Sequence, residues 1–250
     1  MNSLTKRQRG MTKIIAGTGI FILFILLSRL NTANTSSLLG ASIRLGQSSL
    51  LALLCYYCMR SVRIRPQGLP LSRPSKICLG FLGVILLFGL SHLPQSITVL
   101  LKGESRLFWS SLFVALSAGI FEESLVRGLF LSGLLDLTQR SKHSFLKVSV
   151  LSGILFGLLH LVNLQANPLQ AVAQQVVYAS IFGLLFAILR IISNSLWLPI
   201  LVHSLFDFQP TITSGTVEAN SWSLILLLCL PVLVISLVTL WFLDKDNQAA

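Results

Sequence analysis

The sequence has few charged residues, and acidic residues are the scarcest of them. Charged side chains make up 11% of the 250 residues, and only 8 are Asp or Glu. Because a soluble domain carries about 25% charged residues, this composition excludes a water-soluble globular domain. Hydrophobic residues make up 54% of the chain, which excludes an intrinsically disordered protein as well. The composition therefore predicts a membrane protein.

Cysteine is also scarce, and we expect no disulfide framework. The cysteines are Cys55, Cys58, Cys78 and Cys229, and each lies in or beside an apolar run. Cys55 and Cys58 have the C-x-x-C spacing of redox motifs in soluble α/β domains, but here that spacing falls within an apolar run. We therefore interpret these thiols as small packing groups.

Long apolar runs fill the chain and predict an all-α fold. A helix of about 20 apolar residues crosses a bilayer, so the length leaves room for about eight such helices with short loops. The expected spans are 14–30, 38–59, 77–93, 107–135, 146–164, 169–189, 196–208 and 222–243. The expected architecture is a polytopic membrane helical bundle that forms a single membrane domain over residues 1–250. The first span lacks a small-residue cleavage site, so we expect it to be retained.

Basic residues set the expected orientation of the bundle. The 19 Lys and Arg residues give a net charge of +11 and gather at the N-terminus and in segments 60–76 and 136–147, with Arg190 and Lys245 on the same side. The opposite side holds only Arg29, Arg44, Lys102 and Arg106. The positive-inside rule then places both termini in the cytoplasm of a multi-pass protein of the cell membrane.

The same basic clusters bear on the expected partners. They lie between apolar runs, where anionic lipid headgroups attract them, so the lipid bilayer is an expected partner. A nucleic-acid partner is not expected, because no basic soluble module is present to hold one.

Ionisable side chains interrupt some of the predicted spans. Each costs about 2.5–3.5 kcal/mol at the centre of a membrane helix, and such residues usually face the bundle interior and mark functional sites. The informative ones lie in three spans: Glu122, Glu123 and Arg127 in the fourth, His160 in the fifth, and His203 and Asp207 in the seventh. Arg44 weakens the second span.

Helical spacing predicts which of these groups pair. Glu123 and Arg127 are four residues apart and share a helix face, so we expect an ion pair. Glu122 lies about 140° around the helix from Arg127 and is left to face something else. His203 and Asp207 also share a face.

Depth in the membrane predicts that these groups meet. Glu122 and His160 lie about 21 Å from the cytoplasmic ends of their helices, and His203 about 14 Å. We therefore expect them to converge in a water-accessible chamber near the bilayer midplane, as an acid/base or metal constellation.

Three short motifs occur in order on successive predicted helices. They are E-E-x-x-x-R (Glu122, Glu123, Arg127), F-x-x-x-H (Phe156, His160) and H-x-x-x-[ND] (His203, Asp207). Together they resemble the motifs of the CPBP family of intramembrane proteases, which includes the CAAX proteases and bacteriocin-processing enzymes and is also called Abi. Asp207 replaces the commoner Asn, and Val126 stands where an aromatic residue often precedes the arginine. The resemblance covers 107–208, the expected catalytic core.

The resemblance implies an endopeptidase that cleaves a peptide or a membrane-associated protein segment. By analogy with the family, Glu122 and His160 would activate a water molecule. His203 with Asp207 would stabilise the oxyanion. The supporting residues would be Glu123, Arg127, Phe156 and Asn163.

Metal dependence stays open from the sequence. Members of the family have been described as metalloproteases, and two histidines with a carboxylate form a zinc-like ligand set. If zinc is bound, its ligands would be Glu122, His160 and His203. The H-E-x-x-H signature of soluble metalloproteases is absent, and a metal-free Glu/His mechanism is slightly favoured.

The biological role also stays open. The resemblance is compatible with CAAX-type processing and with bacteriocin maturation or self-immunity. The alternatives are a non-catalytic immunity or scaffold membrane protein, and an ion-coupled transporter, since intramembrane carboxylates also mark ion paths. Outside the motifs, His92 and His143 are not expected in the site, and the acidic residues Glu218, Asp244 and Asp246 are expected on the solvated surface.

Overall fold

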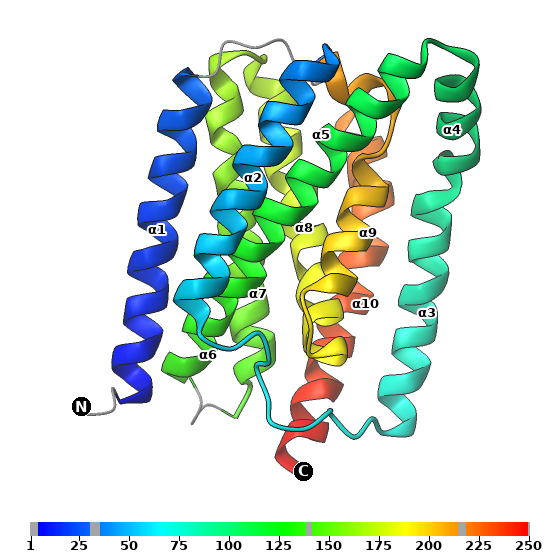
Figure 1. Cartoon of the computed structure of the whole chain (residues 1–250). Coiled ribbons are helices and arrows are strands. Elements are labelled where there is room, and N and C mark those ends of the chain that lie inside the picture. The colour runs from blue at the N-terminus through cyan, green and yellow to red at the C-terminus, as the bar shows by residue number, and fades with distance from the viewer. Residues whose placement is uncertain (1–4, 31–35, 139–141, 215–218, 250) are drawn as a thin grey trace.

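The apolar runs form helices that lie side by side in one bundle (Figure 1). The computed structural model describes residues 5–30, 36–138, 142–214 and 219–249, and these residues contain helices and turns but no strand. The all-α prediction is therefore confirmed. The helices are α1 (Lys6–Leu30), α2 (Leu38–Met59), α3 (Arg73–Gly89), η1 (Leu90–His92), α4 (Leu93–Lys102), α5 (Ser105–Glu123), η2 (Ser124–Phe130), α6 (Leu131–Thr138), α7 (Ser144–Leu159), η3 (His160–Gln165), α8 (Leu169–Ser193), α9 (Trp197–Asp207), η4 (Pro210–Ser214) and α10 (Trp222–Ala249).

Several of these helices continue one another without a loop. The α3–η1–α4 rod runs over 73–102, and the α5–η2–α6 rod over 105–138. Among the described residues, 6 helices are long and apolar enough to cross a membrane: 6–29, 38–59, 73–102, 144–165, 169–193 and 222–249. The chain is therefore a multi-pass membrane protein.

The two remaining predicted spans differ from this simple pattern. The fourth lies in the α5–η2–α6 rod, where the charged residues of the first motif lower the hydropathy. The seventh, expected over 196–208, forms as α9 (Trp197–Asp207), which has 11 residues. At about 1.5 Å per residue it covers about half of a bilayer core, so its bounds agree with the prediction but it does not cross the membrane as a full span. Within the bundle of Figure 1, α9 packs against α5 and α8.

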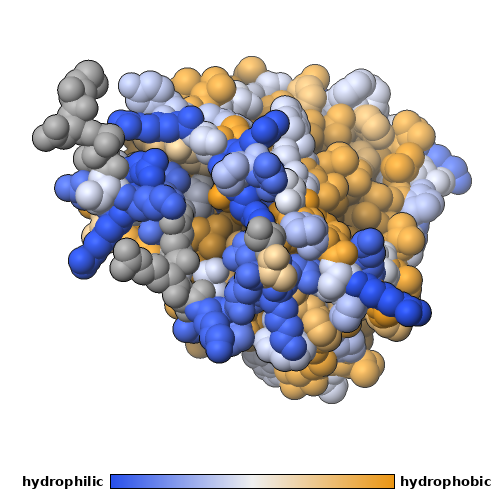
Figure 2. All heavy atoms as spheres, turned by 90° about the horizontal axis from the view of Figure 1, so that it is seen from below, coloured by the Kyte–Doolittle hydropathy of each residue, from blue (hydrophilic) through white to orange (hydrophobic). Residues whose placement is uncertain are grey.

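The bundle has one basic end. We define the basic end as the end that holds Lys6, the α2–α3 loop (60–72) and Lys245, and the outer end as the opposite one. Both chain ends lie at the basic end (Figure 1), which confirms that they share a side. Figure 2, which looks onto this end, shows hydrophilic side chains gathered over it. The positive-inside rule assigns it to the cytoplasm.

Two acidic residues expected on the solvated surface are instead buried. Asp244 and Asp246, near the end of α10, are 1% and 7% exposed. Asp244 accepts hydrogen bonds from the backbone N–H groups of Phe145 and Leu146, each at 2.9 Å, in the first turn of α7. Asp246 accepts one from the N–H of Ser72, the N-cap of α3, at 3.1 Å. Each carboxylate thus satisfies N–H groups that a helix start leaves unpaired.

Arg190 at the basic end also differs from the sequence prediction. We expect it among the basic residues of the cytoplasmic side, but its side chain is fully buried. Its Nε donates to the backbone carbonyl of Arg127 at 3.4 Å, and its Nη2 donates to the carbonyl of Val62. Arg190 therefore connects α8 to η2 and to the α2–α3 loop. Glu218 lies outside the described residues.

Close helix crossings bring the motif-bearing helices together. A Cβ atom on Gly119 of α5 would lie 2.8 Å from the carbonyl oxygen of Ile200 in α9, and one on Gly153 of α7 would lie 2.7 Å from that of Ser180 in α8. Membrane helices commonly use small residues in this way, because close backbone approach maximises packing. These crossings place α5 against α9 and α7 against α8, around the site.

The Asp244 cap should contribute to the stability of the whole bundle. Replacement of Asp244 by Ala leaves two buried N–H groups of α7 unpaired, and we expect a loss of about 1–3 kcal/mol in the free energy of unfolding. Asp244→Asn keeps one acceptor oxygen and should lose less. Thermal denaturation in detergent measures both variants. Equal stability of Asp244→Ala and the parent protein would contradict the capping role.

Candidate active site

The first motif lies where an α-helix changes into a π-helix. Glu122 and Glu123 are the last residues of α5, and the following seven residues, Ser124–Phe130, form the π-helix η2. Single π-turns within α-helices occur frequently at functional sites. Arg127, inside η2, places Nη1 at 3.1 Å from Oε1 of Glu123, and both side chains are fully buried. This is the ion pair that the helical spacing predicts.

Glu123 also binds the last histidine of the motifs. Its Oε1 lies 2.8 Å from Nδ1 of His203 in α9. An ionised carboxylate can only accept hydrogen bonds, so Nδ1 of His203 donates here and the ring orientation is set. Nε2 of His203 then faces two other carboxylates, Asp207 Oδ2 at 3.4 Å and Glu122 Oε2 at 3.8 Å.

Aromatic rings hold the same groups in place from α7 and α8. Phe186 stacks on the His203 ring, with ring centroids 5.0 Å apart and planes 8° apart. Phe156 meets the same ring edge-on at 5.7 Å. The guanidinium of Arg127 lies 4.3 Å from the centroid of Phe156. The motif phenylalanine thus packs between a cation and an imidazole.

His160 begins η3, where α7 narrows into a 3-10 helix. Its Nδ1 lies 2.9 Å from the carbonyl oxygen of Phe156 and donates to it, because a carbonyl only accepts. This bond leaves Nε2 as the nitrogen with a free lone pair. Asn163, one turn further on, donates from Nδ2 to Oε1 of Gln175 in α8 at 2.8 Å.

A cavity of about 750 Å³ joins these side chains. Its lining includes all the residues predicted to be catalytic, together with Phe156 and Asn163; Glu123 and Arg127 lie sealed behind it. Glu122 differs from its neighbour because its side chain is 28% exposed. The predicted catalytic residues in the lining are Glu122, His160, His203 and Asp207.

The cavity opens toward the outer end of the bundle. Its exposed lining residues are Gln209, Thr211 and Asn220, which lie between the end of α9 and the start of α10. Figure 1 shows this connection at the end opposite both chain termini. No described residue of the loops at the basic end lines the cavity.

Several lining residues have no counterpart in the sequence prediction. Phe186, Tyr178 and Gln175 come from α8, which carries none of the three motifs, and Arg44 comes from α2. Arg44 did give a signal, since a charge within an apolar span is costly. The α8 residues gave none, because their role depends on which helix packs beside α9. His92 and His143 do not line the cavity.

The predicted zinc ligands are not assembled as a metal site. Among the described residues, no three His, Cys, Asp or Glu side chains are grouped closely enough to hold a metal ion. The Nδ1 atoms of both His203 and His160 donate hydrogen bonds, to Glu123 and to a backbone carbonyl, and leave Nε2 of each ring facing the cavity side. Histidines that bind a metal through Nε2 make the same bonds, so the zinc ligand set stays a prediction from the sequence.

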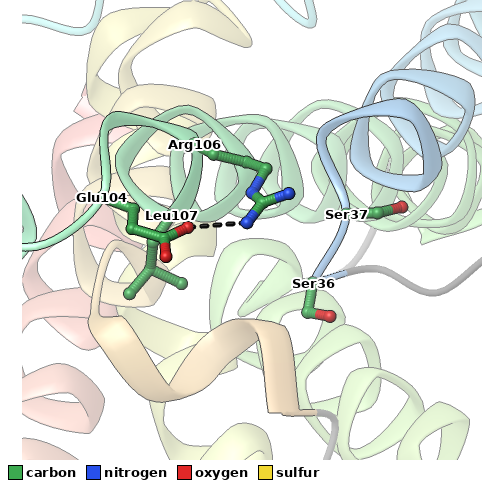
Figure 3. Close-up of a pocket in the computed structure, with 5 residues that line it drawn as sticks. All are labelled: Ser36, Ser37, Glu104, Arg106 and Leu107. Atoms are coloured by element: carbon green, nitrogen blue, oxygen red, sulfur yellow. Dashed lines mark hydrogen bonds and ion pairs between the residues drawn. The ribbon is translucent and has the colours of Figure 1, made fainter.

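A second, smaller hollow lies at the outer end (Figure 3). It has a volume of about 490 Å³ and is lined by Ser36, Ser37, Glu104, Arg106 and Leu107. Arg106 and Glu104 form an ion pair at 2.7 Å, but their side chains are 65% and 74% exposed. Water screens such a pair, so this hollow is part of the solvated surface.

One comparison with known proteins identifies the region that holds the site. Residues 104–209 match the model of a family described as "Rce1-like: Type II CAAX prenyl endopeptidase Rce1-like". This segment runs from the start of α5 to just beyond α9 and contains all three motifs. The family resemblance of the motifs is therefore confirmed. No curated protein and no solved structure matches the chain.

The buried ion pair should matter far more than its exposed counterpart. Arg127→Met leaves the Glu123 carboxylate buried without its guanidinium, and we expect a loss of about 3–5 kcal/mol in the free energy of unfolding. Arg106→Met removes the exposed pair and should lose less than about 1 kcal/mol. Denaturation of both variants in detergent provides the comparison. Similar losses for the two variants would contradict the structural role of Arg127.

Proposed function

From the premise that segment 104–209 is of the Rce1-like family of type II CAAX prenyl endopeptidases, we propose that this protein is an intramembrane endopeptidase. It hydrolyses a peptide bond of a peptide or membrane-associated protein segment inside the cavity. The observation that carries the proposal is one carboxylate, Glu122, open to a cavity beside two histidines. The catalytic core is the segment 107–208.

Glu122 acts as the general base in this proposal. Its carboxylate takes a proton from a water molecule, whose oxygen attacks the carbonyl carbon of the scissile bond. Glu122 and His160 both line the cavity. A water molecule between them would bond to both, with the Nε2 lone pair of His160 as its second acceptor. The proton held by Glu122 then passes to the departing amine.

His203 stabilises the oxyanion that forms on the substrate carbonyl. To donate through Nε2 while Nδ1 donates to Glu123, His203 must carry protons on both nitrogens. The buried Glu123, at 2.8 Å, provides the compensating negative charge. A donor fixed in this way needs no reorganisation when the oxyanion forms, which is the main source of electrostatic catalysis. Asp207, at 3.4 Å from Nε2, holds the ring in the absence of substrate.

The substrate reaches these residues from the outer end. The cavity mouth lies at the end opposite the basic loops, and the positive-inside rule assigns those loops to the cytoplasm. The proposed enzyme therefore accepts a segment that is presented from the non-cytoplasmic face. An exported peptide or the outer part of a membrane protein meets this condition.

Loss of the general base should abolish cleavage without loss of fold. We expect Glu122→Gln to lower kcat by about 10²–10⁴-fold, the usual contribution of a positioned base. Its melting temperature should stay close to that of the parent, because Glu122 is partly exposed. The substrate is first identified by mass spectrometry, which compares membrane peptides from cells with and without the protein. Glu104→Gln, which changes an exposed carboxylate outside the cavity, is the control variant. Undiminished cleavage by Glu122→Gln would exclude this mechanism.

The entry side can be tested in intact cells by thiol labelling. A cysteine placed at the mouth, Gln209→Cys, should react with a membrane-impermeant maleimide added outside. A cysteine in the α2–α3 loop, Ser61→Cys, should react only after permeabilisation. The parent protein gives the background from its own cysteines, of which Cys58 is the only one that is not buried. The reverse labelling pattern would overturn the proposed side of entry.

A further inference from the structure

One cation lines the cavity, and it comes from outside the family segment. Arg44 of α2 is the only Lys or Arg among the described residues that line the cavity. It precedes the matched segment 104–209. Its side chain is partly buried, and it lies six residues after Leu38, the start of α2 at the outer end. This places it about 9 Å below that end.

Arg44 has no partner for its charge among the residues that the structure describes. In the described parts of the chain it forms no ion pair and no hydrogen bond. The two carboxylates of the cavity, Glu122 and Asp207, face Nε2 of His203 instead. A guanidinium within a membrane span costs free energy, and residues of this kind usually have a function. Because these carboxylates face His203, the charge of Arg44 is left to interact with a molecule that enters the cavity.

The groups that accompany Arg44 are suited to a peptide. The mouth and upper wall of the cavity carry carboxamide side chains, which both donate to and accept from peptide groups. Arg44 adds the planar fork that binds a carboxylate through two parallel hydrogen bonds. The carboxamide residues are Asn163, Gln175, Gln209 and Asn220.

We propose that Arg44 binds a carboxylate of the peptide substrate and holds it between the cavity mouth and Glu122. This inference rests on the proposed peptidase function and adds a substrate-binding residue to it. It implies that the enzyme selects peptides with a negative charge a few residues from the scissile bond, because each residue of extended chain spans about 3.3 Å. The carboxylate that Arg44 binds can be the C-terminal carboxyl group of the peptide or an acidic side chain.

The interaction can be measured by changing both partners. The probe is a quenched fluorescent peptide that spans the cleavage site found by mass spectrometry and ends in a free C-terminal carboxylate, in liposomes of zwitterionic lipid. Two matched peptides have a C-terminal amide, one of them with an Asp within the last residues. For the parent protein, we expect kcat/KM for the neutral amide peptide to be about 10- to 100-fold lower than for the peptide with the free carboxylate. This is the range that a charge-assisted hydrogen bond contributes. The Asp peptide reports on an acidic side chain.

Substitutions of Arg44 should remove this discrimination. Arg44→Gln should cleave charged and neutral peptides at the same low rate, and Arg44→Lys should restore part of the preference. The control Arg106→Gln lies at the same end but outside the cavity (Figure 3) and should keep the preference. A merely structural role of Arg44 would lower the cleavage of all peptides by the same factor.

Binding separates this inference from the proposed catalysis. In the Glu122→Gln background, fluorescence anisotropy should show charged peptides binding at least about tenfold more tightly than the neutral one. The additional Arg44→Gln substitution should abolish that difference. Equal binding of all peptides would overturn the inference even if cleavage occurs, as would a preference that survives Arg44→Gln. An effect of Arg44→Gln seen only in liposomes of anionic lipid would also overturn it, because the ligand would be a lipid phosphate.

Discussion

The candidate site depends on one buried carboxylate. Glu123 is fully buried, and its Oε1 is shared between the guanidinium of Arg127 and the imidazole of His203. Burial of a charge in a low-dielectric interior is tolerated only when charged or hydrogen-bonded groups compensate it. These contacts tie α5 to η2 and α9, and Arg127 extends them to α8 through the carbonyl of Gly183 at 3.1 Å. The position of His203 at the cavity therefore follows from the neutralisation of Glu123.

Consecutive glutamates take opposite roles because a helix separates them by about 100°. Glu123 points into the packed interior, whereas Glu122 keeps 28% of its side chain exposed. The first has a structural role that fixes an imidazole. The second is the only one of the two that water and substrate can reach. A single helix end thus supplies both the support of the site and its proposed base.

The charge distribution of the bundle separates its two ends. The basic end holds the chain termini and the arginine-rich α2–α3 loop, and its buried acids Asp244 and Asp246 cap helix starts. The cavity opens at the other end, where carboxamides and the single cation Arg44 line it. The end that is suited to anionic lipid headgroups is therefore separate from the end at which the cavity opens.

The sequence by itself determined the helical class, the position of most spans, the Glu123–Arg127 pair and the likeness of segment 104–209 to the Rce1-like family, because hydropathy, helical spacing and short motifs are local properties of the chain. Only the tertiary structure decided which helices are neighbours. It alone placed Phe186 on the His203 ring, Arg44 in the cavity, and Asp244 and Arg190 in the interior. The physical reason is that membrane helices are apolar on every side, so their sequence pattern does not indicate which face meets which partner.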